Sequence, residues 1–366
     1  NTVDCETIFS FKNFLDKNDF VKYDCRQDNS FFLSKDRSSY IFNSSISGID
    51  DSDICLLIGC DPKIEASILN ARIRKRFLSS DIFYPIGKIG CTSELNYDHI
   101  DLGDDTLSLQ NIYSHKFYNL LKKSKRPIII LGQGAMCSKN ARKIFYKTRE
   151  IYDSLEIKDD WNGFNVLQTY SGRIGALDLD FYNQSIVNKG RSILDQIYEG
   201  SISTLYLCSA DELDFSKIPP STFVIYQGHH GDQGASRANL IIPAPCFTEK
   251  QGIYVNLEGR PQLSNQIKSP IMGVIDSWKF FCELSKKMGT QLDFDNFDRL
   301  RDIMFSKYPN LKHLNKIKKN KLSVLQSTES IKEIEILKSN ISNFYMTDIV
   351  SRNSKTMAEC SKVFID

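Results

Sequence analysis

The sequence predicts an α/β fold built on mostly parallel β-sheets. Short apolar runs rich in β-branched residues are each followed by a glycine or polar break and then by a segment of helical periodicity, first at residues 54–78 and again at 127–151. This alternation is typical of strand–helix units whose strands are buried between helices. We therefore expect strands and helices to alternate through most of the chain.

The first strand–helix unit covers residues 54–78. Its apolar run at 54–58 is predicted to form a buried strand, and residues 63–78 are predicted to form a helix. Asp61 precedes Pro62, which suits an N-cap followed by a proline in the first helical turn. The spacing predicts that one face of this helix is buried, made of Ile64, Ile68, Ala71 and Phe77.

The later units repeat this pattern, and a polar stretch interrupts it after residue 260. Strands are predicted at 127–131, 205–207 and 223–226, and helices at 138–151 and 275–288. The polar stretch 261–269 is predicted to be a loop.

The chain is predicted to comprise a domain, a linker and a tail. Residues 1–315 are expected to form the α/β domain, 316–328 a Lys-rich linker, and 329–366 a helical and extended tail that contains a small amphipathic helix at 329–337. The charge run Lys316–Lys321 favours a solvated linker. An anchor to acidic lipid is the alternative, but the run is short and lacks aromatic residues.

Bulk composition narrows the function classes. The 366 residues include 47 basic and 45 acidic side chains, a net charge of +2, so the chain has no general attraction for nucleic acid. The longest apolar run, residues 54–60, is far shorter than the roughly 20 residues that a membrane-spanning helix needs. Neither nucleic-acid binding nor a direct membrane span is therefore expected.

The ten cysteines predict neither disulfides nor a metal centre. They are scattered through apolar segments of a large chain, which indicates a reducing compartment, and no C-x-x-C pair occurs. Cys55 and Cys60 are five residues apart, and on a continuous strand they would point to opposite faces. Because iron–sulfur clusters need grouped thiolates and zinc usually needs close Cys or His pairs, we expect no metal in this chain.

The densest candidate site is the glycine-rich segment 227–236, directly after the strand at 223–226. Such a loop at the carboxyl edge of a parallel sheet can bring backbone amides to a phosphate or pterin. The alternative is that Gly228, Gly231 and Gly234 only permit tight turns and close packing. His229 and His230, with Asp232, could bind metal or transfer protons, but adjacent side chains diverge, which favours a structural role.

Two further segments have the character of phosphate sites. Gly132-Gln133-Gly134 after the strand at 127–131 is similar to a dinucleotide-binding turn, but the third glycine of the fingerprint is missing. The basic helical stretch with Arg72, Arg74, Lys75 and Arg76 could bind phosphate, but a solvated face or a salt-bridged subunit contact is the favoured interpretation. No nucleophile-elbow or P-loop motif is present. The sequence therefore assigns no catalytic, cofactor-binding or metal-ligating residue.

Three groups of segments nevertheless resemble a known family. They are Leu57-Ile58-Gly59, Asp61-Pro62, Glu65-Ala66 and Asn70 to Lys75; Phe223 to Asp232, Gly234-Ala235, Ala238 to Pro243, Thr248 to Lys250, Tyr254-Val255-Asn256 and Glu258-Gly259-Arg260; and Phe344 to Asp348, Ser351-Arg352 and Thr356-Met357-Ala358. In this order they resemble the 75-kDa-type iron–sulfur subunit family of mitochondrial NADH:ubiquinone oxidoreductase, respiratory complex I. The match covers roughly the C-terminal half of that family's length.

The resemblance implies a Rossmann-like, molybdopterin-oxidoreductase-like fold. It also implies a structural, non-redox part of the peripheral arm of complex I, on the matrix side of the mitochondrial inner membrane, without a cofactor of its own. The iron–sulfur clusters are then expected in a separate N-terminal portion, which is the main expected partner beside other subunits of the arm. Two alternatives stay open, an active molybdopterin-dependent oxidoreductase and a free-standing nucleotide-binding regulator.

Overall fold

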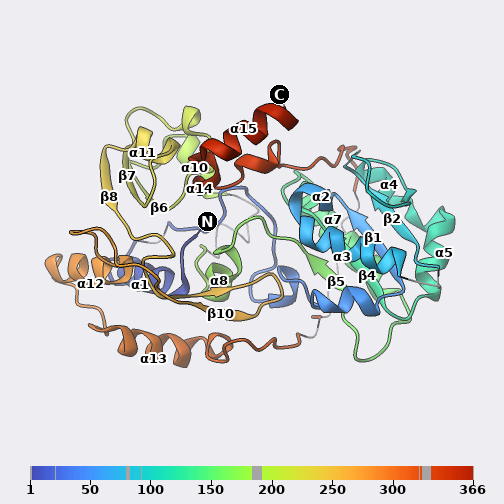
Figure 1. Ribbon diagram of the computed structural model, residues 1–366, viewed down its shortest axis with the longest axis horizontal. Coiled ribbons are helices and arrows are strands. Elements are labelled where there is room, and N and C mark those ends of the chain that lie inside the picture. The colour runs from blue at the N-terminus through green and yellow to red at the C-terminus, as the bar shows by residue number, and fades with distance from the viewer. Residues whose placement is uncertain are drawn as a thin grey trace.

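The computed structural model describes residues 2–20, 22–79, 83–91, 93–183, 192–320, 322–323 and 331–365. The predicted α/β class is confirmed, because two separate parallel sheets are flanked by helices. The sheets lie in two lobes at opposite ends of an elongated molecule, and helices and a hairpin fill the region between and below them (Figure 1).

The first lobe is built on a five-stranded parallel sheet in the order β3-β2-β1-β4-β5. Its strands are β1 (Ile54–Ile58), β2 (Ile86–Ile89), β3 (Ile100–Asp101), β4 (Pro127–Leu131) and β5 (Phe164–Val166). The chain builds the sheet outward from β1 to β3 and then returns to place β4 on the other side of β1. The loops that leave β1 and β4 therefore diverge, and ligands of open α/β sheets bind at such a switch point.

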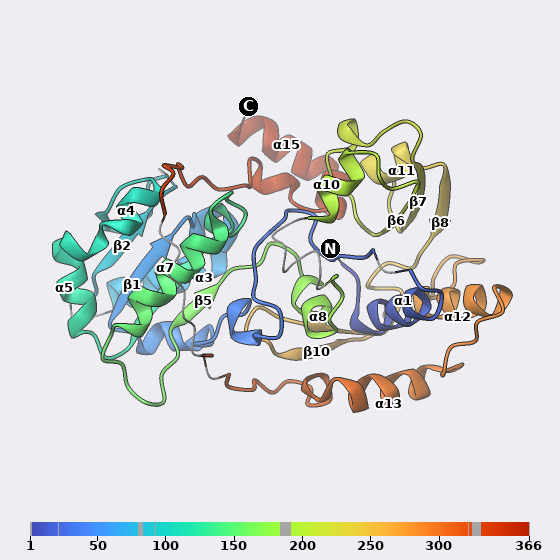
Figure 2. The same cartoon turned by 180° about the vertical axis from the view of Figure 1, so that it is seen from behind.

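Alternation along β1 explains how this sheet is covered on both faces. Ile54, Leu56 and Ile58 belong to the core beneath α5 (Lys116–Lys123) and α7 (Ala141–Asp153). Cys55 and Leu57 belong to the core beneath α3 (Ser67–Leu78). Figures 1 and 2, taken from opposite sides, show α3 in front of the sheet in one view and α7 in the other.

The predicted buried face of the first helix is wrong for Ile68 and Ala71, which are exposed, whereas Phe77 packs against the core as predicted. The helical region is broken at Ala66 into α2 (Pro62–Glu65) and α3, although Asp61 caps α2 as predicted by accepting a hydrogen bond from the N–H of Lys63. The break changes the phase of the helix, so Leu69 and Ile73 are buried while Ile68 is 80% exposed. A periodicity read across the break therefore selected the wrong residues.

The second lobe contains a three-stranded parallel sheet in the order β6-β7-β8. Its strands are β6 (Thr204–Cys208), β7 (Phe223–Gly228) and β8 (Leu240–Pro243), and its helices are α10 (Ile193–Tyr198) and α11 (Gln233–Arg237). Val224 and Tyr226 of β7 are fully buried in its core. The glycine-rich loop predicted after residue 226 follows β7 directly.

A third core lies between the lobes and below them. It joins α1 (Cys5–Lys17), α8 (Arg173–Asp178), α12 (Ser277–Lys287) and α13 (Phe297–Lys307) with the antiparallel pair β9 (Gly252–Val255) and β10 (Pro261–Ser264). The rings of Phe11 and Phe281 stack here at 4.4 Å between centroids. The loop predicted at 261–269 is therefore wrong for residues 261–264, which pair with β9.

Short helical segments complete the fold. They are α4 (Thr106–Gln110), α6 (Gln133–Met136) and the 3-10 turns at Arg37–Ser39, Ser47–Asp51, Ile112–Ser114, Phe215–Lys217 and Pro309–Leu311. In the described parts of the chain, no helix is both long enough and apolar enough to cross a membrane.

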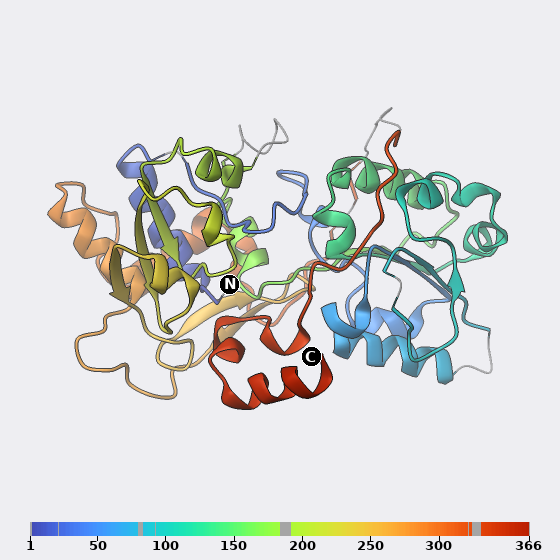
Figure 3. The same ribbon diagram turned by 90° about the horizontal axis from the view of Figure 1, so that it is seen from above.

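The C-terminal tail differs from the expected amphipathic helix. Residues 331–337 are extended, and Ile336 forms a β-bridge with Asp105; residues 329–330 lie outside the described residues. The tail then forms a turn at Phe344–Met346 and the helices α14 (Ile349–Arg352) and α15 (Lys355–Phe364). Seen from above, it crosses from the first lobe to the second (Figure 3). The division at residues 315/316 and 328/329 stays a prediction.

Candidate functional site

The first candidate site is the crevice at the carboxyl ends of β1 and β4, where the loops diverge. Gly59 has a φ of +53°, and a Cβ there would lie 2.5 Å from the backbone nitrogen of Ala135. A Cβ on Gly132 would lie 2.4 Å from the carbonyl oxygen of Gly59. The glycines that resemble a dinucleotide turn are therefore required because the two loops pack directly against each other.

A carboxylate of the protein itself occupies the polar part of this crevice. Glu65, at the end of α2, accepts a hydrogen bond from the N–H of Asp61 at 2.9 Å and another from the N–H of Gln133 at 2.9 Å. Burial raises the pKa of Glu65 to about 7. In a nucleotide-binding sheet, the amides at the start of these two loops would face a phosphate. Here the amides of Asp61 and Gln133 donate to the side chain of Glu65 instead.

The C-terminal strap, defined here as residues 331–340, covers the same crevice. A Cβ on Gly134 would lie 2.3 Å from the carbonyl oxygen of Lys338. The carbonyl of Leu337 accepts a hydrogen bond from Cys91, just beyond β2, at 2.7 Å, and the Leu337 side chain is 1% exposed. The strap backbone therefore lies directly on the loops that follow β2 and β4.

Glu335 and Thr106 fix the strap in place. The carboxylate of Glu335 accepts hydrogen bonds from the hydroxyl of Ser138 at 2.8 Å and from the backbone N–H groups of Lys139 and Asn140. The N–H of Thr106 donates to the carbonyl of Glu335 at 3.0 Å. Glu335 thus accepts hydrogen bonds from the residues just before α7 and from the first residue of α4.

The second candidate site is the glycine loop after β7. Cβ atoms on Gly228 and Gly234 would lie 2.3 Å and 2.7 Å from atoms of the Tyr226 side chain. The hydroxyl of Tyr226 donates to Asp211 at 2.7 Å, and the same carboxylate accepts the N–H of Gly234 at 2.9 Å. These two glycines therefore accommodate a buried tyrosine, whereas Gly231 has no atom within 4 Å of a Cβ position.

The two predicted histidines belong to this loop and contact each other, so the expectation that their adjacent side chains diverge is wrong. The Nδ1 atoms of His229 and His230 are 2.6 Å apart, and Nε2 of His229 lies 3.3 Å from the hydroxyl of Thr2. Burial, with the neighbouring His230, lowers the pKa of His229 to about 4. His229 is therefore neutral at physiological pH, which suits a hydrogen-bonding role.

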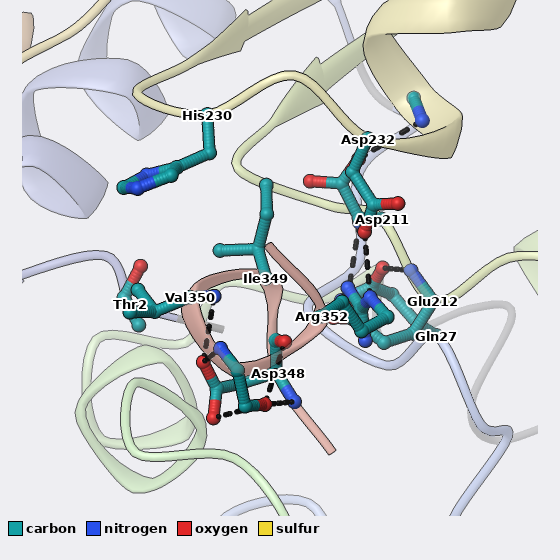
Figure 4. Close-up of polar contacts among 12 residues, drawn as sticks. Thr2, Gln27, Asp211, Glu212, His230, Asp232, Asp348, Ile349, Val350 and Arg352 are labelled. Carbon is teal, nitrogen blue, oxygen red and sulfur yellow. Dashed lines mark hydrogen bonds and ion pairs between the residues drawn. The ribbon is translucent and has the colours of Figure 1, made fainter. Parts of the chain in front are cut away.

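Asp232, the third predicted residue of this group, points away from the histidines and binds the tail. Arg352 of α14 donates to Asp232 at 2.6 Å and to Glu212 at 2.9 Å, as Figure 4 shows. Ile349 of the same helix is buried in the core of the second lobe. The helix α14 of the tail therefore packs against the second glycine loop, as the strap packs against the first.

The basic stretch on α3 is largely engaged within the chain. Arg72 pairs with Asp50 at 2.6 Å, Arg76 donates twice to the carbonyl of Ser52, and Arg74 donates to the carbonyl of Asn96. A shallow hollow of about 580 Å³ lies beside it, lined by Lys63, Ser67, Asn70, Ala71, Arg74 and Asn96. These contacts favour the salt-bridged surface over a phosphate site.

The cysteines correct one expectation about geometry. Cys55 and Cys60 do not lie on opposite faces, because the chain turns at Gly59 and both thiols enter the same core. Burial raises the pKa of Cys55 to about 12 and that of Cys60 well above its usual range, so both are held as thiols. Among the described residues, no group of three or more His, Cys, Asp or Glu side chains could hold a metal ion.

Comparison with known proteins gives relatives along almost the whole chain. Residues 1–287 match the family model for molybdopterin oxidoreductase, and residues 315–360 match the model for the C-terminal part of the NADH-ubiquinone oxidoreductase G subunit.

Three relatives illustrate the match. The chain is 35% identical to the NADH-quinone oxidoreductase G subunit of Rickettsia bellii, over 97% of this chain and 50% of the relative. It is 34% identical to the mitochondrial NADH dehydrogenase [ubiquinone] iron-sulfur protein 1 of Solanum tuberosum, over 98% and 48%. It is also 34% identical to the NADH-ubiquinone oxidoreductase 75 kDa subunit of Reclinomonas americana, over 100% and 54%.

The chain thus spans about half the length of the curated relatives it matches. The α/β fold with parallel sheets is consistent with the family model that covers residues 1–287. The resemblance to the 75-kDa-type subunits of NADH:ubiquinone oxidoreductase is confirmed, and the chain belongs to the molybdopterin oxidoreductase family.

Proposed function

We propose that this chain is a structural, non-redox part of the peripheral arm of respiratory complex I. In this role it supports the cluster-bearing portion of the arm during electron transfer from NADH to ubiquinone. The relatives are named as subunits of NADH-ubiquinone or NADH-quinone oxidoreductase, and one of them as an iron–sulfur protein. The proposed location is the matrix side of the mitochondrial inner membrane, and the naming of two relatives as mitochondrial proteins supports the mitochondrial part of this proposal.

The observation that carries the non-redox proposal is the closure of the crevice in the first lobe. A molybdopterin or a nucleotide would need the space above Gly134 and the amides of Asp61 and Gln133. The strap carbonyl of Lys338 fills that space, and Glu65 accepts both amide hydrogens. The residues present therefore do not fit a pyrophosphate group at this place.

The second glycine loop is also unsuited to an anionic cofactor. Asp211, Glu212 and Asp232 bring three carboxylates to the loop, and Arg352 is already engaged by two of them. Placing a phosphate beside these carboxylates would be electrostatically unfavourable. This argues against both alternatives, the active molybdopterin enzyme and the nucleotide-binding regulator.

The proposed partner corresponds to the part of the relatives that this chain does not match. We expect that part to carry the iron–sulfur clusters. Whether that part is a separate polypeptide or belongs to a longer chain, it would meet this chain over a large and permanent interface. Interfaces of that kind are extensive and partly apolar. Exposed apolar side chains that such an interface could cover include those of Leu240, Ile241, Ile267, Ile271 and Met272.

Native electrophoresis of mitochondrial membranes tests the proposal. The tagged chain should migrate with the band that oxidises NADH, and the purified chain should contain neither molybdenum nor pterin fluorescence. Anaerobic reconstitution of the purified chain should likewise yield no iron–sulfur absorbance. Stoichiometric iron with acid-labile sulfide, bound pterin, or a chain that migrates entirely outside the complex would each contradict the proposal.

A further inference from the structure

Helix α3 carries apolar side chains on its outer face as well as on its buried face. Leu69 and Ile73 belong to the core of the first lobe, whereas Ile68 is 80% exposed and Leu78 61%. In Figure 1 the helix lies in front of the larger sheet. Its exposed residues follow each other at spacings of three or four positions and form the outer stripe, made of Ile68, Ala71, Lys75 and Leu78. Apolar residues at this spacing are anchors for a second helix.

The two helices of this region also carry an excess of positive charge. Residues 62–78 contain five basic side chains and one acidic side chain, Glu65, which accepts hydrogen bonds in the crevice. Within the described part of the chain, the ion pair made by these five cations is that of Arg72 with Asp50. Lys75, in the outer stripe, is exposed and forms no ion pair with a described residue. Its ammonium group is therefore available to a carboxylate of another molecule.

Two further cations line the shallow hollow beside α3. The Nζ of Lys63 donates to the carbonyl of Glu94 at 3.0 Å, and the Nε of Arg74 donates to the carbonyl of Asn96 at 3.2 Å. A carbonyl oxygen satisfies such a donor without cancelling its charge. The first turn of α3 has neither a side-chain cap nor an acidic residue, so the positive end of the helix dipole adds to this charge. The outer stripe is thus flanked by a surface that favours anionic groups.

We propose that the outer face of α3 binds an acidic amphipathic helix of another subunit of the complex. The apolar side chains of that helix pack on the outer stripe, and its carboxylates face Lys63, Arg74 and Lys75. This inference rests on the proposed function, since the partner belongs to the same complex. A free phosphate ion would leave the apolar stripe uncovered, and a second copy of this chain would place like charges against each other, which opposes association. An acidic helix satisfies both the apolar and the charged part of the surface.

Zero-length crosslinking of the purified complex tests this contact directly. A carbodiimide joins a lysine amine to a carboxylate that it touches, so Lys75 should become linked to an Asp or Glu of another subunit. The linked segment should carry apolar residues every three or four positions, and acetylation of Lys75 by an amine reagent should be lost on assembly.

The other outcomes of this experiment contradict the proposal. Links of Lys75 only to Glu94 or Asp98 of its own chain, or equal acetylation of the isolated chain and the complex, would mean that no acidic partner covers α3. A link to a second copy of this chain would mean that the face joins two copies. Loss of acetylation without any link to a carboxylate would mean that the occupant is not an acidic helix.

A charge reversal with a matched control provides the second test. Lys75→Glu reverses the charge in the last turn of α3, and Lys123→Glu makes the same change in the last turn of α5, on the opposite face of the same sheet. Incorporation into the complex should fall about 10-fold or more for Lys75→Glu and stay near the wild-type level for Lys123→Glu, because only the former sets like charges against the partner. The thermal melts of the two isolated chains should be similar.

A compensating change in the partner completes this test. Replacement of the crosslinked carboxylate by Lys should restore the incorporation of Lys75→Glu, since the two altered side chains again attract each other. Equal incorporation of the Lys75 and Lys123 variants, or no restoration by the compensating change, would refute the contact.

The two proposals fail in different ways. If the wild-type chain does not enter the complex, the proposed function is wrong and the α3 contact falls with it. If the wild-type chain enters the complex but Lys75 stays reactive, or Lys75→Glu incorporates normally, only the α3 contact is wrong.

Discussion

Glu65 connects the backbones of two diverging loops through one buried carboxyl group. Its oxygens accept N–H groups that belong to Asp61 and Gln133, 72 residues apart in the sequence. A carboxylate that accepts backbone N–H groups usually has a lowered pKa, but desolvation dominates here and raises the pKa of Glu65 from 4.5 to about 7. The crevice therefore contains a group that titrates near physiological pH.

This shift predicts a pH-dependent stability. The folded protein holds the proton of Glu65 more tightly than the unfolded chain does, so this contribution is present in full below about pH 4.5 and is lost as the pH rises through 7. It changes by roughly 1.4 kcal/mol for each unit of pKa shift. Unfolding measured from pH 4.5 to 8 should show the wild type losing more stability than Glu65→Gln.

The difference between the pH profiles of wild type and Glu65→Gln reports the contribution of Glu65 alone. Burial raises the pKa of Glu6 to about 7 as well, but Glu6 is present in both proteins and its effect cancels. Parallel pH profiles for wild type and variant would show that Glu65 has an ordinary pKa.

The histidine pair leads to a second prediction. Replacement of both His229 and His230 by Gln retains hydrogen-bonding groups, so it should lower stability or assembly in proportion while leaving turnover per assembled complex nearly unchanged. A removed acid–base group would reduce turnover by about 100-fold or more. NADH oxidation normalised to assembled complex distinguishes these outcomes, and a selective loss of turnover would give the pair a chemical role.

Among the elements, those with purely local signals could be predicted from the sequence. The strands at 54–58 and 127–131 match β1 and β4, because a short apolar run bounded by turn residues has few other structures available. Asp61 and Pro62 likewise mark the start of α2.

The strap could not be predicted, because its structure depends on distant residues. Its apolar residues Ile331, Ile334 and Leu337 fit a helical period, and an isolated segment would show the same pattern. Pairing with Asp104 and Thr106, more than 200 residues earlier, makes the segment extended instead. The role of Glu65 in the crevice was missed for the same reason, since no local pattern places Gln133 beside it.

At this scale, Gly134 provides the sharpest test of the strap. A Cβ in Gly134→Ala would collide with the carbonyl of Lys338, which belongs to backbone and cannot rotate away. We expect a loss of about 1–3 kcal/mol in the free energy of unfolding, together with faster proteolysis within residues 331–340.

Gly231→Ala is the matched control for this variant. It places the same methyl group in open space at the other glycine loop and should change stability by less than about 0.5 kcal/mol. Equal stability of the two variants would mean that the strap does not lie on Gly134.

On the scale of the whole molecule, one tail is attached to both lobes. The strap lies on the first lobe through Glu335 and Leu337, and α14 lies on the second through Ile349 and Arg352. Neither attachment is large enough to be a domain core. The tail is therefore expected to hold the lobes together and to prepare the chain for assembly.

Deletion of residues 340–366 tests this role. The first lobe keeps residues 331–339 and should remain folded, whereas the second lobe loses the buried Ile349 and the ion pairs of Arg352 with Glu212 and Asp232. The thermal melt should retain a cooperative transition, while incorporation into the complex, measured by native electrophoresis, should fall. Wild-type incorporation with normal NADH oxidation would show that this part of the tail is dispensable.

The position of the strap also has a consequence for biosynthesis. The bond between Glu335 and Ser138 joins residues 197 positions apart, so it forms only after most of the chain has been translated. Since domains fold from the N-terminus during synthesis, the nascent first lobe carries an open crevice until the strap leaves the ribosome. A chain cut short before residue 331 would lack the Lys338 carbonyl over Gly134 and the buried Leu337 side chain, and would leave the residues that they cover open to chaperones and proteases. The strap can therefore cover the crevice only in a chain that has been translated at least as far as Glu335.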